Sequence, residues 1–168
     1  YLSKRLFDYA KDEFDTALKL ASENFDLVYE YANYLHATTD FKKADEYYQK
    51  AIELDPHHTD ALAFSALNKI QLKDFDKAYE QIQHALHHET NNDFMYFIAG
   101  KIRYLQGEIE DAKMYFVKSY ELQKTYDCEH MLGLCYFELG NFEQANGIFK
   151  HMLEKNPLNV NLLLNSAK

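Results

Sequence analysis

The stretch that decides the fold reads Phe41-Lys42-Lys43-Ala44-Asp45-Glu46-Tyr47-Tyr48-Gln49-Lys50-Ala51. An aromatic residue, an alanine, a second aromatic and a second alanine follow one another at steps of three, four and three. Such steps keep the four side chains on one face of an α-helix. Small side chains let a neighbouring helix approach closely, and the aromatic ring fills the space that remains between them. The stretch therefore predicts a helix that packs through one face.

The same pattern recurs along the chain at intervals of 34 residues, and once at an interval of 33. Internal repetition at such a period is the signature of repeat architectures. One helix cannot bury its apolar face alone, whereas stacked copies can, and this stacking builds a solenoid. The corresponding residues of the other copies are Phe7, Ala10, Phe14 and Ala17; Phe75, Ala78, Ile82 and Ala85; Ile109, Ala112, Phe116 and Ser119; and Phe142, Ala145, Phe149 and Met152.

The residues that break helices fall in phase with the repeat. Pro56 and Pro157 each stand twelve residues after the first Ala of their copy, where proline ends a second helix. Gly107 and Gly140 stand five residues before that Ala, at the turn between the two helices. Only 2 Pro and 5 Gly are present in the whole chain, too few for the many turns of an all-β domain. This punctuation favours long helices joined by short loops.

Two further positions keep the same phase. Gly100 and Gly133 lie seven residues before the turn glycines, where a missing side chain allows two helices to approach closely. Asp40, Asp74 and Asn141 follow the turn, and their short polar side chains are predicted to cap the second helix.

With these residues in place, the chain resembles the tetratricopeptide repeat family. The resemblance implies an all-α fold, a right-handed superhelical solenoid of antiparallel helix pairs. It says little about function, because the marked positions are packing positions. The positions that the family marks with Leu-Gly, Tyr, Gly, Tyr/Phe, Ala, Phe and Pro are filled in order by Leu132, Gly133, Tyr136, Gly140, Phe142, Ala145, Phe149 and Pro157.

The repeat register divides the chain into copies. Four copies are predicted, at residues 25–58, 59–92, 93–125 and 126–159. Residues 1–24 resemble the second half of a preceding repeat, and residues 160–168 resemble the start of a further repeat or a capping helix. Because natural arrays end in polar capping elements, we expect the chain to be a segment of a longer protein.

The middle copies depart from the family pattern at two places. Thr39 and Lys73 replace the turn glycine, and Lys69 and Arg103 replace the tyrosine that stands at Tyr136. We expect these substitutions to change local helix angles and to leave the architecture intact.

Charge and hydropathy exclude several classes of partner. The net charge is −9, from 27 acidic and 18 basic residues, and Arg5 and Arg103 are the only arginines. Such a surface repels phosphate backbones and anionic lipid headgroups, so neither nucleic acid nor membrane is a predicted partner. No apolar run in the sequence approaches the length of a membrane-spanning helix.

The two cysteines are predicted to be reduced. Cys128 and Cys135 are seven residues apart, which on one helix is about 10 Å, too far for a disulfide. We interpret both as packed thiols, the alternative being redox activity. Reduced thiols and an acidic pI of about 5.3 favour a cytoplasmic location.

Catalytic signatures are absent from the sequence. The five glycines do not cluster into a phosphate-binding loop, and no nucleophile elbow or His-Glu-x-x-His motif occurs. We predict no enzyme activity, no catalytic residue and no cofactor. His84 and His88 have the i,i+4 spacing that can chelate a metal, but we favour an exposed helix end whose dipole suits them. His57, after Pro56, is predicted to be a solvated loop residue, so no metal site is predicted.

The family resemblance also implies a concave surface lined by the first helix of each repeat. Places 2, 5, 9 and 12 of each copy form that lining. Its rim is predicted at Asp26, Asp60 and Asp127. Its groove is predicted at Tyr29, Asn33, His36, Ala63, Leu67, Ile70, Phe94, Phe97, Lys101, Tyr104, His130, Leu134 and Phe137.

An apolar groove with an acidic rim predicts a protein or peptide partner that carries apolar anchors and some basic residues. Some members of the family hold a ligand's C-terminal carboxylates with Lys, Asn and further basic residues. Asn33 fits one of those places, whereas Tyr29 and Phe94 stand at two that require a basic residue. We therefore expect a scaffold or adaptor that does not bind carboxylate tails in this way.

Two alternatives to the scaffold remain open at this point. The chain could self-associate as a homo-oligomer through its array ends or its groove. It could also be a regulatory or targeting module of a larger enzyme.

Overall fold

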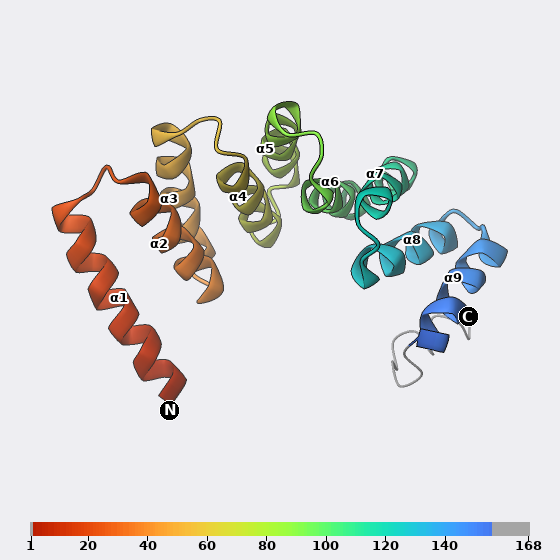
Figure 1. Cartoon of the computed structure of the whole chain (residues 1–168), viewed down its shortest axis with the longest axis horizontal. Coiled ribbons are helices and arrows are strands. Elements are labelled where there is room, and N and C mark those ends of the chain that lie inside the picture. The colour runs from red at the N-terminus through yellow and green to blue at the C-terminus, as the bar shows by residue number, and fades with distance from the viewer. Residues whose placement is uncertain (1, 156–168) are drawn as a thin grey trace. The chain divides into compact units, whose positions relative to one another are not determined.

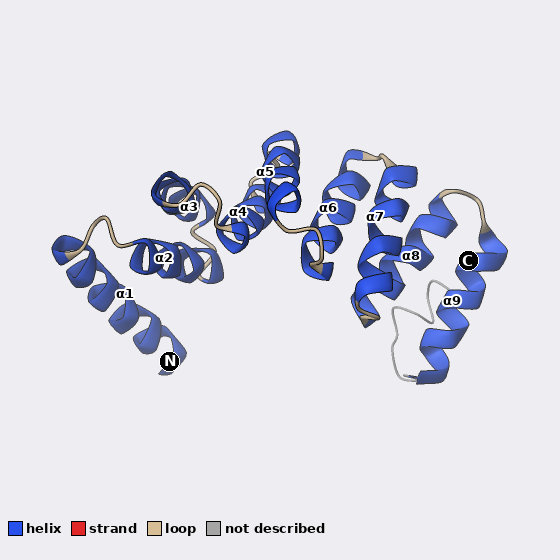
Figure 2. Cartoon of the chain, turned by 45° about the horizontal axis from the view of Figure 1, so that its top comes forward, coloured by secondary structure: helices blue, strands red, loops and turns tan. Residues whose placement is uncertain are grey.

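The computed structural model describes residues 2–155, and over that part it contains nine α-helices and no strand (Figures 1 and 2). Pro157 and the predicted opening of a further repeat at 160–168 lie outside the described residues, as does the side chain of Phe7. The helices are α1 (Leu2–Leu20), α2 (Phe25–Ala37), α3 (Phe41–Leu54), α4 (Thr59–Gln71), α5 (Phe75–His88), α6 (Asp93–Gln106), α7 (Ile109–Leu122), α8 (Tyr126–Glu138) and α9 (Phe142–Lys155).

Consecutive helices form pairs joined by short turns, α2 with α3, α4 with α5, α6 with α7 and α8 with α9 (Figure 1). The first helices of the pairs begin at Phe25, Thr59, Asp93 and Tyr126. The all-α prediction is confirmed over the described part of the chain. None of the described helices combines the length and the apolar character that a membrane crossing requires.

The chain divides into two compact units. The N-terminal unit reaches to His88 and holds α1 to α5, and the C-terminal unit starts at Glu89 and holds α6 to α9. Each unit has its own buried side chains.

The core consists of the positions that the repeat pattern marks. The alanines of the second helices lie against the first helix of the same pair, and the aromatic or aliphatic residue four places on fills the space beside them. Burial of each large side chain contributes about 1.5–3 kcal/mol. The pattern residues with exposed fractions of 0 to 2% are Ala44, Tyr48, Ala51, Ala78, Ile82, Ala85, Ala112, Phe116, Ser119, Ala145, Phe149 and Met152.

The predicted close approach at the helix glycines is confirmed. A Cβ atom on Gly100 would lie 2.8 Å from the ring of Phe116, and one on Gly133 would lie 2.4 Å from the ring of Phe149. Both rings are fully or almost fully buried. The first helix therefore rests directly on the aromatic ring of its partner helix.

The turn inside each pair has one residue with a left-handed backbone. Gly107 and Gly140 have φ of 85° and 75°, and Thr39 and Lys73 have φ of 65° and 60°. The last two residues carry a Cβ that crowds the backbone in this region. Thr39 and Lys73 therefore keep the left-handed turn geometry of the glycines, at the cost of backbone strain in these two turns.

Two predicted caps form the expected hydrogen bonds. The Asp40 carboxylate accepts from the Lys43 backbone N–H at 3.4 Å, and the Asp74 carboxylate accepts from that of Lys77 at 3.5 Å. Asn141 directly precedes α9. The caps satisfy backbone donors that a helix start leaves without intrahelical partners.

In the second copy, Lys69 stands at the position of Tyr136 and forms an ion pair. Lys69 on α4 is 5% exposed, and its Nζ lies 2.8 Å from Asp45 on α3. In the fourth copy Tyr136 occupies that place, and Lys113 on α7 lies with its Nζ 5.7 Å from the ring centroid. Asp45 and Lys113 each follow the first pattern alanine of their copy. The two copies therefore make the same helix contact with different chemistry, which explains how the architecture tolerates the substitution.

Substitution of Gly133 and of Gly147 by alanine should have opposite effects on stability. Gly133→Ala forces the ring of Phe149 to move, and overpacking of this kind costs about 1–3 kcal/mol. Gly147→Ala, in the open middle of α9, should instead stabilise by about 0.5–1 kcal/mol, because alanine loses less backbone entropy. Thermal and urea unfolding of the two variants, side by side, provide the measurement. A stabilised Gly133→Ala protein would contradict the packing described above.

Relief of backbone strain should stabilise the turns. Lys73→Gly removes a left-handed non-glycine residue, whose cost of about 1–2 kcal/mol exceeds the added flexibility of glycine, so the unfolding midpoint should rise. Thr39→Gly should gain at least as much, because threonine is β-branched. Gly107→Ala is the reverse change and should lower the midpoint. If all three variants unfold at the same midpoint as the unaltered protein, these turns are unstrained.

Candidate protein-binding surface

In the N-terminal unit, one side of the first helices remains partly exposed. Tyr29, Asn33 and His36 on α2 and Leu67 on α4 are partly exposed, and we call these four residues the N-terminal wall. The two helices contact each other directly. Other residues of α2, such as Val28 and Leu35, are buried. The wall is therefore the side of α2 that the neighbouring helices leave open.

Aromatic rings surround Tyr29 on this wall. Its ring centroid lies 5.7 Å from those of Phe25 and His58 and 6.3 Å from that of Phe64. The ring of Tyr48, from the core below, lies 6.4 Å away. Such clustering fixes the orientation of Tyr29 and gives the wall a rigid apolar surface.

Hydrogen bonds hold the polar side chains of the N-terminal wall in place. The Tyr48 hydroxyl donates to Asn33 Oδ1 over 2.8 Å, and burial raises the pKa of Tyr48 far above its ordinary value, so the donor stays protonated. His36 Nδ1 lies 3.0 Å from Asn68 Oδ1, whose amide nitrogen donates to the Phe41 carbonyl. The Asn33 amide is thus oriented by a buried partner from the second helix.

Two predicted groove residues, Ala63 and Ile70, are not on the surface. Their exposed fractions are 0% and 7%. Both lie on α4, on which eight residues are buried, against four on α2, five on α6 and four on α8. The prediction that Ala63 and Ile70 line an open surface is corrected: their side chains belong to the interior, and Leu67 represents α4 on the wall.

The C-terminal unit has a corresponding surface on α6 and α8, the C-terminal wall. Phe94 is 38% exposed, and the other six residues are partly exposed. The wall consists of Phe94, Phe97, Lys101, Tyr104, His130, Leu134 and Phe137.

Rings of the C-terminal wall are shared between the surface and the core. Phe97 and Tyr104 pack against the buried cluster around Phe116, and the ring centroids of Phe97 and Phe116 are 5.6 Å apart. Phe137 packs against the cluster around Phe149. Truncation of these rings would therefore remove core contacts as well as wall surface. Phe94, with the largest exposed fraction, is the aromatic residue that best separates binding from folding.

Acidic side chains stand beside both walls. The rim residues Asp26, Asp60 and Asp127 are exposed. Burial is the main cause of the raised pKa of Tyr29; a hydrogen bond with Asn33 opposes it and the charge of Asp60 adds to it. Burial lowers the pKa of His130, and the charge of Asp127 acts in the opposite direction. Each wall thus lies within the electrostatic reach of a rim carboxylate.

Both cysteines lie in the interior of the C-terminal unit. Cys128 and Cys135 are free thiols with no exposed surface. Burial raises both pKa values, that of Cys135 to about 12. Cys128 Sγ also donates a hydrogen bond to the Phe116 carbonyl at 3.0 Å. A neutral, buried thiol is a poor nucleophile, which supports the interpretation of both as packing residues.

The structure adds a third histidine to the pair on α5 that the sequence pattern had indicated. His57, predicted as a solvated loop residue, lies with His84 and His88, and the three offer ligand atoms within 4.8 Å of one another. Helical spacing could find only the pair on α5, because His57 comes from a turn 27 residues earlier.

Comparison with known proteins places the repeats in a family. Residues 25–58 and 127–159 each match a model of the tetratricopeptide repeat. The mitochondrial import receptor subunit TOM70 of Rattus norvegicus is 36% identical over 110 residues, which cover 62% of this chain and 18% of that protein. The BBSome complex member BBS4 of Bos taurus is 31% identical over 124 residues, or 73% of this chain and 24% of that protein. The chain spans about a fifth to a quarter of these relatives.

Solved structures share the fold. A tetratricopeptide repeat protein from Parabacteroides merdae superposes with a TM-score of 0.86 at 16% identity, over 99% of this chain and 67% of that one. MamA from Desulfovibrio magneticus gives a TM-score of 0.84 at 14% identity, over 94% and 90% of the two chains. The expected all-α repeat solenoid is confirmed.

The thiols should be inert in the folded protein. Because both pKa values are raised, the thiols stay protonated at neutral pH, and Ellman's reagent should label neither until the protein is unfolded in guanidinium. Ser22→Cys, in the exposed turn between α1 and α2, is the matched control and should label at once. Rapid labelling of the native chain without that substitution would show that this part of the core opens.

Proposed function

We propose that this chain, which belongs to the tetratricopeptide repeat family, is a scaffold in which the wall of each unit can bind a peptide or amphipathic helix of a protein partner. The observation that carries the proposal is the repeated exposure of aromatic, aliphatic and amide side chains at equivalent places of the first helices. Anchored rings with a polar surround are what peptide-recognition surfaces require.

The relatives support a role in protein assemblies. By name, TOM70 is an import receptor subunit and BBS4 is a member of a complex. The shared stretch is the repeat region, so a protein-binding role is the property that the present chain would have in common with them.

The partner's chemistry follows from the walls and the rim. Rings such as Tyr29 and Phe94 suit leucine, phenylalanine or methionine anchors. The exposed carboxylates of Asp60 and Asp127, on a chain of net charge −9, favour lysine and arginine next to those anchors. The same tyrosine and phenylalanine rings can hold a cation above their faces. We therefore infer a partner segment with apolar anchors flanked by basic residues.

Recognition of a free C-terminal carboxylate fits neither wall. Tyr29 and Phe94 stand where basic residues would be needed, and Asn33 Oδ1 already accepts from Tyr48. The negative charges of the rim carboxylates would also repel an acidic tail. The proposed ligand is thus an internal basic and apolar segment.

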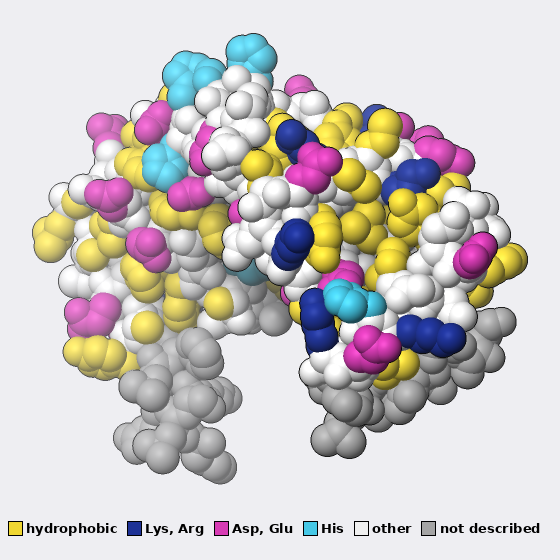
Figure 3. Space-filling view, turned by 45° about the vertical axis from the view of Figure 1, so that its right-hand side comes forward, with side chains coloured by type: hydrophobic (Ala, Val, Ile, Leu, Met, Phe, Trp, Pro, Cys, Tyr) yellow, Lys and Arg dark blue, Asp and Glu magenta, His cyan; other side chains and the backbone are white. Residues whose placement is uncertain are grey.

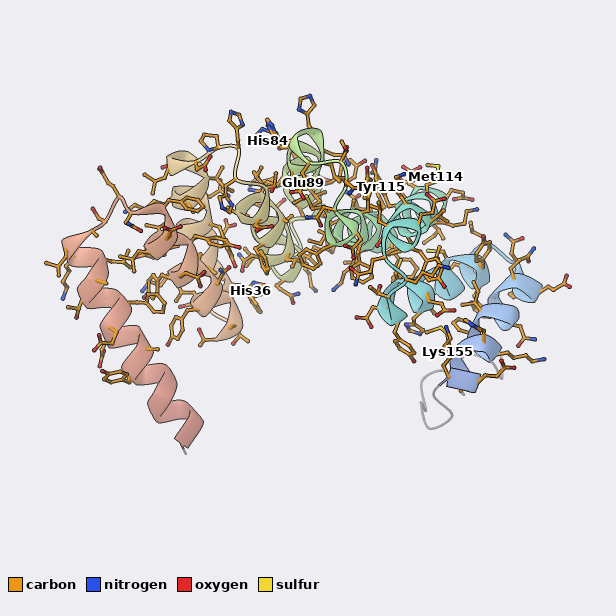
Figure 4. The ribbon with its side chains drawn as sticks, in the orientation of Figure 1. His36, His84, Glu89, Met114, Tyr115 and Lys155 are labelled. Atoms are coloured by element: carbon orange, nitrogen blue, oxygen red, sulfur yellow. The ribbon has the colours of Figure 1, made fainter. Side chains whose placement is uncertain are left out.

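Loss of the exposed anchor should abolish binding without loss of stability. A random peptide library displayed on phage, selected against the protein, supplies the probe peptides, and fluorescence anisotropy measures their affinity. Phe94→Ser should weaken binding by at least about tenfold, since interface aromatics commonly contribute more than 1 kcal/mol. Met114→Ser also removes an exposed apolar side chain, on α7 (62% exposed; Figure 4); it is the control and should bind normally.

The charge of the rim offers an independent test. Asp60→Asn combined with Asp127→Asn should weaken the selected peptides and flatten the dependence of their affinity on salt. Glu46→Gln combined with Glu143→Gln removes two exposed charges from second helices and should have little effect. If selection yields no peptides, or both pairs behave alike, the walls are not the binding surface.

Self-association is the competing use of these surfaces. Light scattering after size-exclusion chromatography, at two protein concentrations, distinguishes it from binding of a different protein. A monomer leaves the walls open to a partner. A dimer that Phe94→Ser disrupts would replace the proposed partner by a second copy of this chain.

A further inference from the structure

Three imidazoles converge at one edge of the N-terminal unit. His57 comes from the turn between α3 and α4, and His84 and His88 lie one turn apart on α5. All three side chains are exposed. Figure 3 shows histidine side chains gathered at the upper edge of the molecule, and Figure 4 shows His84 there among neighbouring rings. The cluster is separate from the walls, whose residues lie on the first helices.

The distances between the ring nitrogens suit a shared metal ion. His57 Nδ1 lies 3.1 Å from His88 Nε2, and His84 Nε2 lies 3.3 Å from the same atom. A zinc ion with tetrahedral Zn–N bonds of 2.0–2.1 Å separates its ligand atoms by about 3.3 Å. The ligand atoms of all three side chains lie within 4.8 Å of one another, so small rotations of exposed rings would complete the geometry.

Hydrogen bonds between the three imidazole rings do not fully account for their close approach. His88 Nε2 faces a nitrogen on each side, yet a ring nitrogen has either one proton or one lone pair in the plane of the ring. It can therefore form one good hydrogen bond and not two.

The turn that carries His57 is held from both sides. The His57 backbone N–H donates to Asp55 Oδ1 at 3.2 Å. His58, the next residue, caps α4 by accepting from the Ala61 backbone N–H with its Nδ1 at 3.3 Å. The backbone around His57 is thus ordered by contacts that do not use its ring, and the ring is left to face α5.

We propose that His57, His84 and His88 form a binding site for one divalent transition-metal ion, with zinc as the physiological candidate. Imidazole nitrogen suits zinc, copper and nickel, whereas magnesium and calcium take oxygen ligands. Three protein ligands leave a fourth position for water.

The ion would tie two successive repeats together. His57 belongs to the copy at 25–58, and His84 and His88 belong to the copy at 59–92. Because the metal binds the assembled pair and not the separated helices, it stabilises the N-terminal unit by an amount that grows with the logarithm of its concentration above the dissociation constant. The site is thus a clamp between adjacent repeats, independent of partner binding on the walls.

Calorimetric titration of the EDTA-treated protein with zinc sulfate tests the site. We expect one zinc per chain and a higher melting temperature with zinc than without it. His57→Gln, His84→Gln and His88→Gln should each weaken zinc binding by more than the roughly 10- to 100-fold that loss of a ligand's supporting hydrogen bond costs. His87→Gln, an exposed neighbour on the same helix, is the matched control and should bind zinc like the unaltered chain. Magnesium should cause no shift.

The His57→Gln variant decides between the clamp and a simpler surface chelate. If it binds zinc like the unaltered protein while His84→Gln does not, only the α5 pair binds metal and the clamp is wrong. The proposal is also wrong if His87→Gln weakens zinc binding as much as the other three substitutions do, or if the unaltered protein binds fewer than one zinc per chain. Melting of the metal-free variants shows whether each is folded, and cobalt absorption typical of tetrahedral coordination, present only with all three histidines, provides the confirming signal.

Discussion

The structure depends on one packing contact, a small residue of one helix set against a large ring of its partner. Gly100 lies on Phe116 and Gly133 on Phe149 so closely that a methyl group has no room. Buried alanines such as Ala44 and Ala78 bring the other side of each pair together. No single helix can bury such a face, so each helix requires the other helix of its pair. The pairs then stack on one another along the chain.

This contact also determines which surfaces remain for recognition. The second helices turn their patterned face toward the first helices, whose far sides are left partly open in each unit. Phe97 and Tyr104 are therefore half core and half surface, which couples partner binding to stability. Helix α4 is the exception, since Ala63 and Ile70 are buried and more of its residues are buried than on the other first helices. A common place in the repeat does not guarantee common exposure.

The repeat tolerates chemical substitution wherever the geometry of a contact can be kept. Lys69 with Asp45 replaces the contact that Tyr136 makes with Lys113. Thr39 and Lys73 adopt the left-handed backbone of the glycines they replace. Chain connectivity also produces proximity that no copy requires by itself: the turn after α3 lies beside α5, and this places His57 with His84 and His88.

The sequence by itself determined the helices, their order and most of the core, because these depend on spacing within one helix and on a period repeated along the chain. The pattern alanines, the helix glycines and the caps at Asp40 and Asp74 were all predictable from residues a few places apart. The exposure of the wall residues was not, since it depends on how many neighbours cover each helix, as Ala63 shows. The histidine group was equally hidden, because His57 and His84 are separated by 27 residues. Only packing of whole helices against one another fixes distances of that kind.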